Sequence, residues 1–372
     1  MKSILTLTLL LFSINIFSAE ERYLNRSAHG LLVGDAYTAR ADGAFTLFYN
    51  PALLARHTGF SFWAINPQVD VTNPLDDPDK YSDLGSSPNE IADVLFSSPI
   101  HVGLGAAPGF KMGRFGLSAI LNNNSNLTLY NKVTPMLDID YRFDKGFIMG
   151  YAHPLWGNYS TKGGGGEHLA FGLSVKYIQR ESIYGTYNLT SPTLYRALES
   201  GDIDTILSSL GQVKGSGWGF DMGLDYAKRT GANGISVGLA ITDVYTNLIT
   251  DSNENDAEVQ PQYLQANLGV AWEFGLAESF GLVLSADYRN LEDSTKEFSK
   301  KTRFGVELKM SPALSLMGGV NSGLYSYGLK FSTGFLTLYG GMYGADVGQK
   351  QGQVTSDRAI VYLSLFDFTF DG

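Results

Sequence analysis

Charged side chains recur on the small, glycine-rich face of segments whose other face is apolar. In residues 216–226, Asp221 and Asp225 share a face with three glycines, and Trp218 and Phe220 lie on the opposite face. Successive side chains of a β-strand point to opposite faces, so the two kinds of residue separate in space. Carboxylates and cations gathered on one interior face can form ion pairs or hold a polar ligand.

Other alternating segments carry further charges in the same position. The residues that we predict to face one shared polar interior are Lys176, Asp221, Asp225, Asp287, Arg303, Glu307 and Lys309. Buried charges are tolerated when they are paired or hydrated, so we expect ion pairs among them. A polar interior also disfavours a purely apolar cargo.

Motifs that could support catalysis or metal binding lack the necessary context. Residues 234–238 match G-x-S-x-G, but they lie within an alternating strand rather than at a strand–turn–helix elbow. Asp251 begins a sequence like a calcium loop, but Asp256 replaces its essential glycine. The five histidines show no metal-ligand spacing. We therefore predict no catalytic residue, no metal site and no cofactor.

The elements that must position these charges are strands. The segments with alternating apolar and polar residues are 59–70, 102–110, 114–122, 136–143, 146–153, 168–181, 216–228, 234–245, 263–274, 279–289, 302–310, 314–321, 324–331, 335–343 and 357–370. Single-chain outer-membrane barrels have an even number of strands, so one of these fifteen segments is wrong, and 114–153 is the doubtful region. We predict 14 strands, with 12 and 16 as alternatives.

The connections between these segments alternate in length. From the C-terminus, 344–356 is long and 332–334 is short, 290–301 is long and 275–278 is short, and 182–215 is very long. Residues 322–323 are an exception. Short turns at one end and long loops at the other are typical of transmembrane β-barrels, whereas the alternative, a soluble β-sandwich, does not separate its loops in this way. The predicted fold class is therefore all-β, an up-and-down antiparallel transmembrane barrel.

Composition narrows the compartment and the partners. The chain of 372 residues has 43 glycines, 13% aromatic and 17% charged residues, no cysteine and a net charge of −10. The negative charge disfavours nucleic acid as a partner. Residues 1–18 have the short basic and apolar regions of a signal peptide, for which a retained anchor is the alternative. We expect export to the outer membrane of a Gram-negative bacterium.

Two segments break the alternation. Residues 191–210 space their apolar side chains as a helix does, and residues 88–97 have the same character over a shorter length. We predict a helix within each of these long loops, either packed on the barrel rim or acting as a lid.

The segment before the first strand has the most specific motif. Residues 34–55 read GDAYTARADGAFTLFYNPALLA, in which the alanine-rich front favours a helix and the Asn50-Pro51 pair ends it. This segment resembles the N-terminal plug of the long-chain fatty acid transporter (FadL) superfamily, which includes PorV-like and conjugal-transfer TraF-like barrels. The resemblance implies a plug at residues 19–57 inside a barrel at residues 58–372. The plug or gate residues that it implies are Asp35, Arg40, Asp42, Asn50, Pro51 and Ala52.

The resemblance implies passive transport of small hydrophobic molecules across the outer membrane, with lipid and such a ligand as partners. A second reading is a docking or assembly component, PorV-like or TraF-like, that binds a protein partner through loops 182–215 and 246–262. A barrel enzyme with a site in the lumen or at the rim is the third. The first reading requires no catalytic residue.

Overall fold

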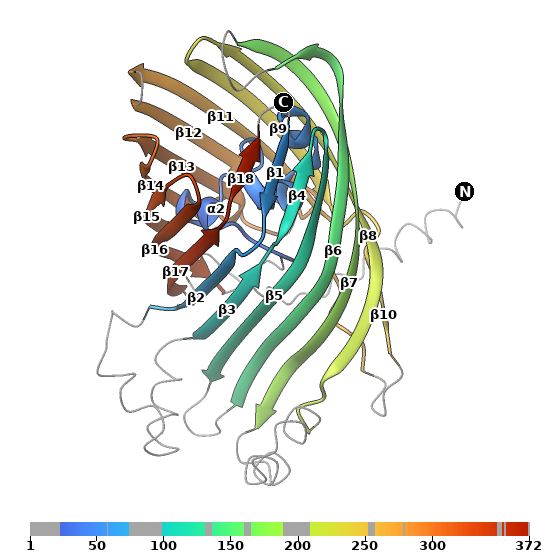
Figure 1. Ribbon diagram of the computed structural model, residues 1–372. Coiled ribbons are helices and arrows are strands. Elements are labelled where there is room, and N and C mark those ends of the chain that lie inside the picture. The colour runs from blue at the N-terminus through green and yellow to red at the C-terminus, as the bar shows by residue number, and fades with distance from the viewer. Residues whose placement is uncertain are drawn as a thin grey trace, which may run out of the picture.

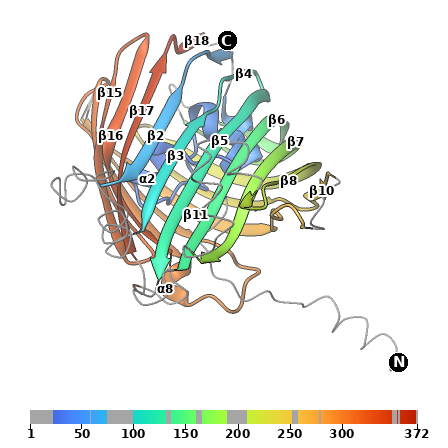
Figure 2. The same ribbon diagram turned by 90° about the horizontal axis from the view of Figure 1, so that it is seen from below.

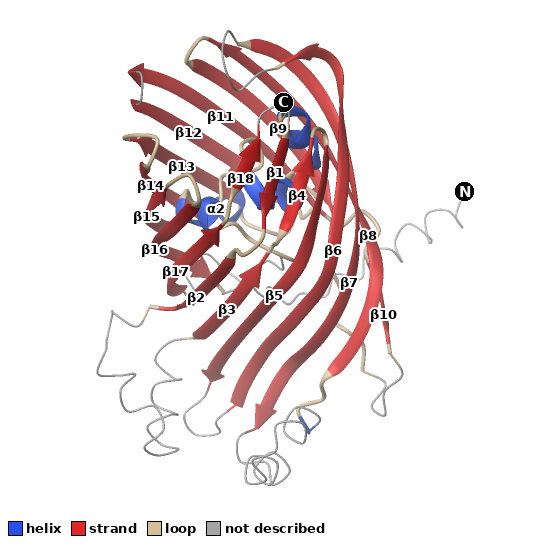
Figure 3. Cartoon of the chain, in the orientation of Figure 1, coloured by secondary structure: helices blue, strands red, loops and turns tan. Residues whose placement is uncertain are grey.

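The computed structural model describes residues 23–57, 59–73, 99–130, 136–159, 165–188, 209–251, 257–277, 280–347, 352 and 355–370. Strands dominate, and the few helices are short (Figure 3). The helical elements are α2 (Ala28–Leu32), η1 (Gly43–Phe45), α3 (Thr46–Tyr49), η2 (Pro51–Arg56) and α8 (Phe298–Lys301). No helix among the described residues is long and apolar enough to cross a membrane.

The strands form one antiparallel sheet that closes on itself (Figure 1). They are β1 (Phe60–Trp63), β2 (Pro67–Thr72), β3 (Ile100–Ala106), β4 (Gly109–Met112), β5 (Phe115–Tyr130), β6 (Met136–Asn158), β7 (Gly166–Asn188), β8 (Val213–Thr230), β9 (Asn233–Thr242), β10 (Asn247–Thr250), β11 (Gln265–Ala277), β12 (Phe280–Tyr288), β13 (Thr302–Lys309), β14 (Leu314–Asn321), β15 (Leu324–Ser332), β16 (Leu336–Asp346), β17 (Thr355–Leu365) and β18 (Phe368–Phe370).

These eighteen segments make fourteen barrel strands, because four strands are each interrupted once. The interrupted pairs are β1 with β2, β3 with β4, β9 with β10, and β17 with β18, and in each pair both segments lie against a shared neighbouring strand. The predicted count of 14 is therefore confirmed.

The first and last strands close the barrel. Val69 on β2 pairs with Val361 on β17, and Phe60 on β1 pairs with Phe370 on β18. The connections 113–114, 231–232 and 333–335 leave one end of the barrel, where the C-terminus also lies (Figure 1). We call this the short-turn end, and the opposite end the long-loop end.

The alternation predicted from sequence is borne out on both faces of the wall. On β8, Trp218 and Phe220 are 50% and 48% exposed on the outer face, whereas Asp221 and Asp225 are buried inside. The outer face carries exposed apolar side chains on other strands as well, among them Phe304 and Tyr327. Such a belt is the surface that a bilayer requires of a barrel.

The extra segment in the predicted set is explained by β6. Residues 136–143 and 146–153 were predicted as two strands, but they form one strand that pairs with β7 without a break across residues 144–146. The charged residues that resemble a turn are satisfied within the ladder. Asp144 accepts a hydrogen bond from Arg180 at 2.6 Å on the inner face, and Lys145 lies 3.6 Å from Glu181 on the outer face.

Several predicted strands are also too short. β6 and β7 each have 23 residues, whereas β13 and β14 have eight, so the wall is much taller on one side of the barrel (Figure 1). The extension is stabilised at the long-loop end, where Arg180 binds Gln260 and Gln262 of an inward-folded segment.

The predicted signal peptide, the predicted helix at 88–97 and most of that at 191–210 lie outside the described residues.

Residues 23–57 lie inside the ring of strands, as seen along the barrel in Figure 2. The helix predicted over the alanine-rich front is wrong. Residues 36–42 are non-helical, because Asp35 adopts a φ of 59° and the next amides bind a carboxylate of the wall instead of helix carbonyls. The helix α3 ends at Tyr49, directly before the Asn50-Pro51 pair that was predicted to end a helix, and Asn50 caps the 3-10 helix η2.

Three adjacent strands are interrupted near the short-turn end, and one side chain closes the seam between two of them. Asn66, between β1 and β2, donates to the carbonyl of Ala107 at 2.8 Å and accepts from its N–H at 2.9 Å. Ala107 lies in the break between β3 and β4. The side-chain amide thus replaces the missing backbone pairing, and both residues are fully buried.

We expect Asn66→Ala to lower the free energy of unfolding by about 1–3 kcal/mol, because the buried Ala107 N–H loses its acceptor. The carbonyl keeps Ser118 Oγ as a donor at 3.2 Å. Urea unfolding of the barrel in lipid vesicles measures the change. Asn233→Ala is the control, because Asn233 is exposed and accepts one bond, from Gly275. Equal stability of the two variants would contradict this role for Asn66.

Candidate functional site

Carboxylates of the wall hold the internal segment in place, and the first is Asp287 on β12. Its Oδ2 accepts from the backbone N–H groups of Tyr37 and Thr38 at 3.0 and 2.9 Å. These two amides cannot reach helix carbonyls, so the carboxylate satisfies them in a buried place. The bond also fixes the non-helical path of residues 36–42.

Asp225 on β8 is the second anchor. Its carboxylate accepts from Arg56 Nε at 2.7 Å and also binds the Nη2 atom of the same guanidinium, and His168 Nε2 lies 2.9 Å away. The Arg56 side chain is 12% exposed and that of Asp225 is fully buried. A two-pronged pair of this kind positions the end of η2 against the wall.

Glu307 on β13 is the third anchor, and it gathers several groups of the internal segment. Arg40 Nη2 binds its Oε2, and His29 Nε2 lies 3.1 Å from the same oxygen. His29 Nδ1 lies 3.0 Å from the hydroxyl of Tyr37, which donates to Asp42 at 2.5 Å. Burial, and then the negative charge of Asp42, raise the pKa of Tyr37 well above its usual value, so the phenol remains a donor.

A reversed arrangement joins Asp35 of the internal segment to Arg289, which follows β12. Arg289 Nη1 binds Asp35 Oδ2, and the hydroxyl of Tyr49 donates to Oδ1 at 2.8 Å. Asp35 therefore ties two parts of the internal segment to the wall.

The Asn50-Pro51-Ala52 turn rests on glycines of the wall. Asn50 Oδ1 accepts from Ala52 N at 3.0 Å, and its Nδ2 donates to Thr38 O and to Leu224 O of β8. A Cβ atom at Gly223 would lie 2.0 Å from Asn50 Oδ1, and one at Gly172 would lie 2.3 Å from Ala52 N. The glycine face of these strands thus makes room for the turn.

The other predicted interior charges are not anchors of the internal segment. Lys176 Nζ lies 2.6 Å from Asp221 and 2.7 Å from Asp243, so this cluster joins β7, β8 and the break after β9. Arg303 donates to the carbonyl of Lys300 and to Ser322 Oγ.

Lys309 is the most exposed of the residues that we predict to face the interior, because the other six are buried. Its side chain is 45% exposed, and Nζ lies 3.9 Å from a carboxylate oxygen of Glu273.

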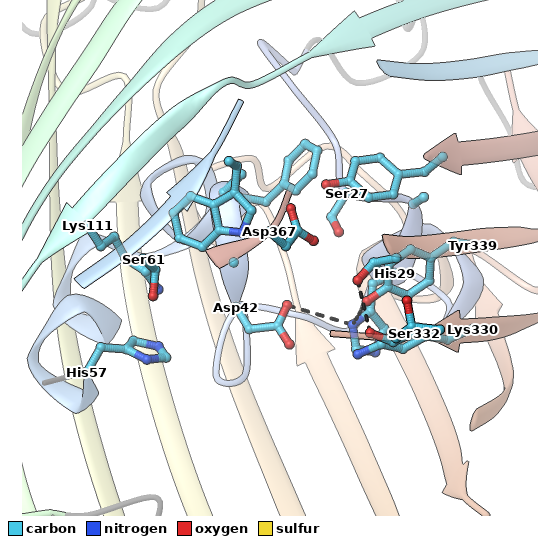
Figure 4. A pocket seen from close by; sticks show the side chains of 18 of the residues that line it. Ser27, His29, Asp42, His57, Ser61, Lys111, Lys330, Ser332, Tyr339 and Asp367 are labelled. Atoms are coloured by element: carbon cyan, nitrogen blue, oxygen red, sulfur yellow. Dashed lines mark hydrogen bonds and ion pairs between the residues drawn. The ribbon is translucent and has the colours of Figure 1, made fainter. Parts of the chain in front are cut away.

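A cavity of about 430 Å³ lies between the internal segment and the wall near the short-turn end. The internal segment contributes residues 27–29, residues 42–45 and His57, and the wall contributes side chains of β1, β4, β15, β16 and β17 (Figure 4). The aromatic residues among its lining are Phe45, Trp63, Tyr339 and Tyr362. Its other lining groups include hydroxyls and five charged or titratable side chains besides His29.

The titratable groups lie on two sides of the cavity. Figure 4 shows Lys111, Ser61 and His57 on one side, Tyr339 and Lys330 on the other, and Asp42 between them.

The electrostatics of this cavity keep His57 neutral and Asp42 charged. The Lys111 ammonium, and then burial, lower the pKa of His57 to about 3. Burial alone would raise the pKa of Asp42, but hydrogen bonds and charge from His29, Lys330 and Tyr37 lower it. The Asp42 side chain is 52% exposed because it faces the internal cavity.

Sequence reasoning missed several of these residues. The partners His29, Arg56, His168 and Arg289 and the cavity residue Lys111 were not singled out. His168 and Lys111 could have been found, because each alternates with outward apolar residues. The pairings of His29 and Arg56 depend on the path of the internal segment, which no local pattern reveals. Among the described residues, no group of three or more His, Asp or Glu side chains is arranged to hold a metal.

These features define a closed antiparallel barrel of fourteen strands with an N-terminal segment packed in its interior. No family model and no curated protein matches the chain. Among solved structures, it is similar to the toluene transporter TodX of Pseudomonas putida, with 11% identity, a TM-score of 0.46, and coverage of 95% of this chain and 100% of TodX.

Two further structures have comparable similarity. The toluene transporter TbuX of Ralstonia pickettii is 10% identical, with a TM-score of 0.44, and the match covers 95% of this chain and 100% of TbuX. A deltaS2 mutant of the TodX monoaromatic hydrocarbon channel is 13% identical, with a TM-score of 0.48 and coverage of 92% and 98%.

These three structures are described as toluene transporters or as a monoaromatic hydrocarbon channel, and the FadL superfamily remains what residues 34–55 resemble in sequence. Because their TM-scores are below 0.5, the fold assignment rests on the strand register of the chain itself. None of them is a PorV-like or TraF-like protein, so that finer assignment stays a prediction.

We expect Asp225→Ala to lower the free energy that holds the internal segment against the wall by about 3–5 kcal/mol, because it leaves the buried guanidinium of Arg56 without its anion. The expected result is a higher frequency of open events in planar lipid bilayers, and faster proteolysis of residues 23–57. The double variant Arg56→Met/Asp225→Ala removes both charges and is the control, which should recover most of the wild-type behaviour. If both variants conduct alike, the ion pair is not what holds the segment.

Proposed function

We propose that the chain is an outer-membrane channel of Gram-negative bacteria, FadL-like, that passes small hydrophobic molecules by passive diffusion. The observation that carries this proposal is the cavity of about 430 Å³ between the internal segment and the wall. Its volume is in the range of small-molecule sites, and its aromatic walls suit a ligand of aromatic size. We accordingly regard residues 19–57 as a plug and residues 58–372 as the barrel.

The distribution of contacts supports a plug in which residues 43–45 move while the rest stays bound to the wall. The three wall carboxylates Asp225, Asp287 and Glu307 bind the plug at Arg56, at the amides after Ala36, and at Arg40. Residues 43–45, which border the cavity, touch the wall through aromatic contacts such as Phe45 with Tyr362, whose ring centroids are 5.9 Å apart. Displacement of residues 43–45 opens a path while the anchors stay in place.

The proposed exit leads along the barrel axis to the short-turn end. Thr333 and Gly334, in the turn between β15 and β16, line the cavity and lie at this rim. The seam at Asn66 is closed by two hydrogen bonds, so an exit through that part of the wall would first require the loss of both. The predicted entry at the long-loop end falls largely on residues outside the description.

The plug residues predicted from sequence have distinct proposed roles. Asp35 and Arg40 act as tethers to Arg289 and Glu307, and Asn50, Pro51 and Ala52 form the turn that rests on the wall. Asp42 faces the cavity and is the one of the six that a passing molecule would meet. Docking through loops 182–215 and 246–262 has no supporting observation of its own among the described residues.

We expect Ala44→Phe to block passage, because Ala44 is buried at the cavity border and the added ring fills the space that a ligand needs. The measurement is the rate of labelled toluene accumulation by intact Gram-negative cells that lack their own hydrophobic-compound channels. The expected loss is about tenfold relative to the wild-type protein, the size of effect expected from filling a binding space. Ala232→Phe, in an exposed turn, is the control.

Uptake no faster with the wild-type protein than without it would contradict the transport function. Unchanged uptake by Ala44→Phe would contradict the route through the cavity.

A further inference from the structure

Lys111 is the most deeply buried cation that lines the cavity. It points inward from β4, between Phe110 and Met112, and is 4% exposed. Met112 is 60% exposed on the outer face, as the alternation of a strand requires. The ammonium group lies 5.3 Å from the centre of the Trp63 ring, so the ring supplies part of its stabilisation.

No carboxylate of the described residues lies within ion-pair distance of Lys111 Nζ. The contrast with Lys176 is informative, because Lys176 is also buried but has two carboxylates within 2.7 Å. An ammonium group withdrawn from bulk water is costly unless it gains an anion. Lys111 is thus a buried cation with an open side toward a cavity, which is a binding position for an anion.

The neighbours of Lys111 limit the ligand to one negative charge. His57 is on the same side of the cavity and is neutral, so it can donate one hydrogen bond without competing for the cation. Asp42 and Asp367 also line the cavity. Asp42 lies between Lys111 and Lys330, the other lysine of the lining, so a second anionic group on the ligand would meet a carboxylate before it reached Lys330 and be repelled.

The remaining walls favour an aromatic body. Trp63 lies beside Lys111, and Phe45, Tyr339 and Tyr362 complete the aromatic lining. Aromatic rings pack against one another in stacked or edge-on arrangements, which a flat ligand can enter. A single-ring molecule is small relative to about 430 Å³, so it leaves room for water at the hydroxyl groups.

We propose that the cavity binds a small aromatic monocarboxylate, with its carboxylate on Lys111 Nζ and its ring against Trp63. This inference rests on the proposed function, which explains why a ligand enters the cavity. It specifies the class of molecules that bind there. A neutral aromatic molecule passes the same walls without the ionic contact. A dicarboxylate is excluded by Asp42 and Asp367.

The test is calorimetric titration of the purified full-length protein in detergent with benzoate, benzyl alcohol and terephthalate. Benzoate should bind about tenfold more tightly than benzyl alcohol, since a charge-assisted hydrogen bond is worth that much or more. Terephthalate should bind more weakly than benzoate. Equal binding of benzoate and benzyl alcohol, or tighter binding of terephthalate, would overturn the proposal.

Variants locate the binding position. Lys111→Met should weaken benzoate binding by about tenfold and leave benzyl alcohol unchanged, whereas Lys111→Arg should stay within about threefold of wild type. Lys330→Met is the matched control, because Lys330 lines the opposite side of the same cavity. A loss in Lys330→Met without one in Lys111→Met would place the anion elsewhere.

The change in electrophoretic mobility on heating verifies that each variant is a folded barrel, and the three wild-type titrations stand if Lys111→Met fails to fold. Failure of this inference and of the proposed function can be told apart. Toluene uptake without benzoate binding overturns only the inference, and benzoate binding without toluene uptake overturns only the transport function.

Discussion

The structure depends on one constraint: a polar peptide segment lies inside a barrel, and its backbone and charges must all find partners there. Asp287 satisfies two plug amides, Asp225 neutralises Arg56, and Glu307 binds Arg40. The glycines of the wall, such as Gly172 and Gly223, let the plug approach closely enough for these bonds to form. The glycines of the inward face therefore give the internal segment room, and its carboxylates bind that segment. Losing one partner leaves a buried group unsatisfied, which costs more than the bond contributes.

The ion pairs that hold the internal segment are unevenly placed along it. The parts that they hold differ from the part that borders the cavity. Ion pairs fix η2, Arg40 and Asp35, whereas residues 43–45 meet the wall through aromatic contacts beside the cavity. Aromatic contacts are weak and tolerant of small shifts compared with a buried two-pronged ion pair. In the proposed function, the internal segment thus remains bound while residues 43–45 move. Among the described residues, Lys111 has no carboxylate within ion-pair distance, whereas Asp225 and Glu307 of the wall bind Arg56 and Arg40.

The sequence predicted the parts of this structure that follow from a local period. Alternation placed Trp218 outside and Asp225 inside, and connector lengths separated the two barrel ends. It failed where a local signal competes with distant partners. Residues 144–146 resemble a turn, but Arg180 on the next strand satisfies Asp144. Residues 36–42 favour a helix by composition, but Asp287, about 250 residues away in the chain, captures their amides. The plug pairings and the cavity depend on such long-range contacts, so no spacing rule could reveal them.

From the sequence, the polar interior disfavours an apolar cargo, but in the folded chain many of its charges are paired with the internal segment or with one another. A charge that is paired with the plug or with its neighbours is not presented to a passing molecule. Asp221 is bound by Lys176, Asp225 by Arg56 and Glu307 by Arg40, and all three carboxylates are buried. In the proposed function, a ligand meets the cavity lining, which combines four aromatic rings and several hydroxyl groups with the charged side chains of Asp42, Lys111, Lys330 and Asp367. The count of charges on the inner face therefore describes how the plug is held, and the groups left unpaired at the cavity determine what can bind there.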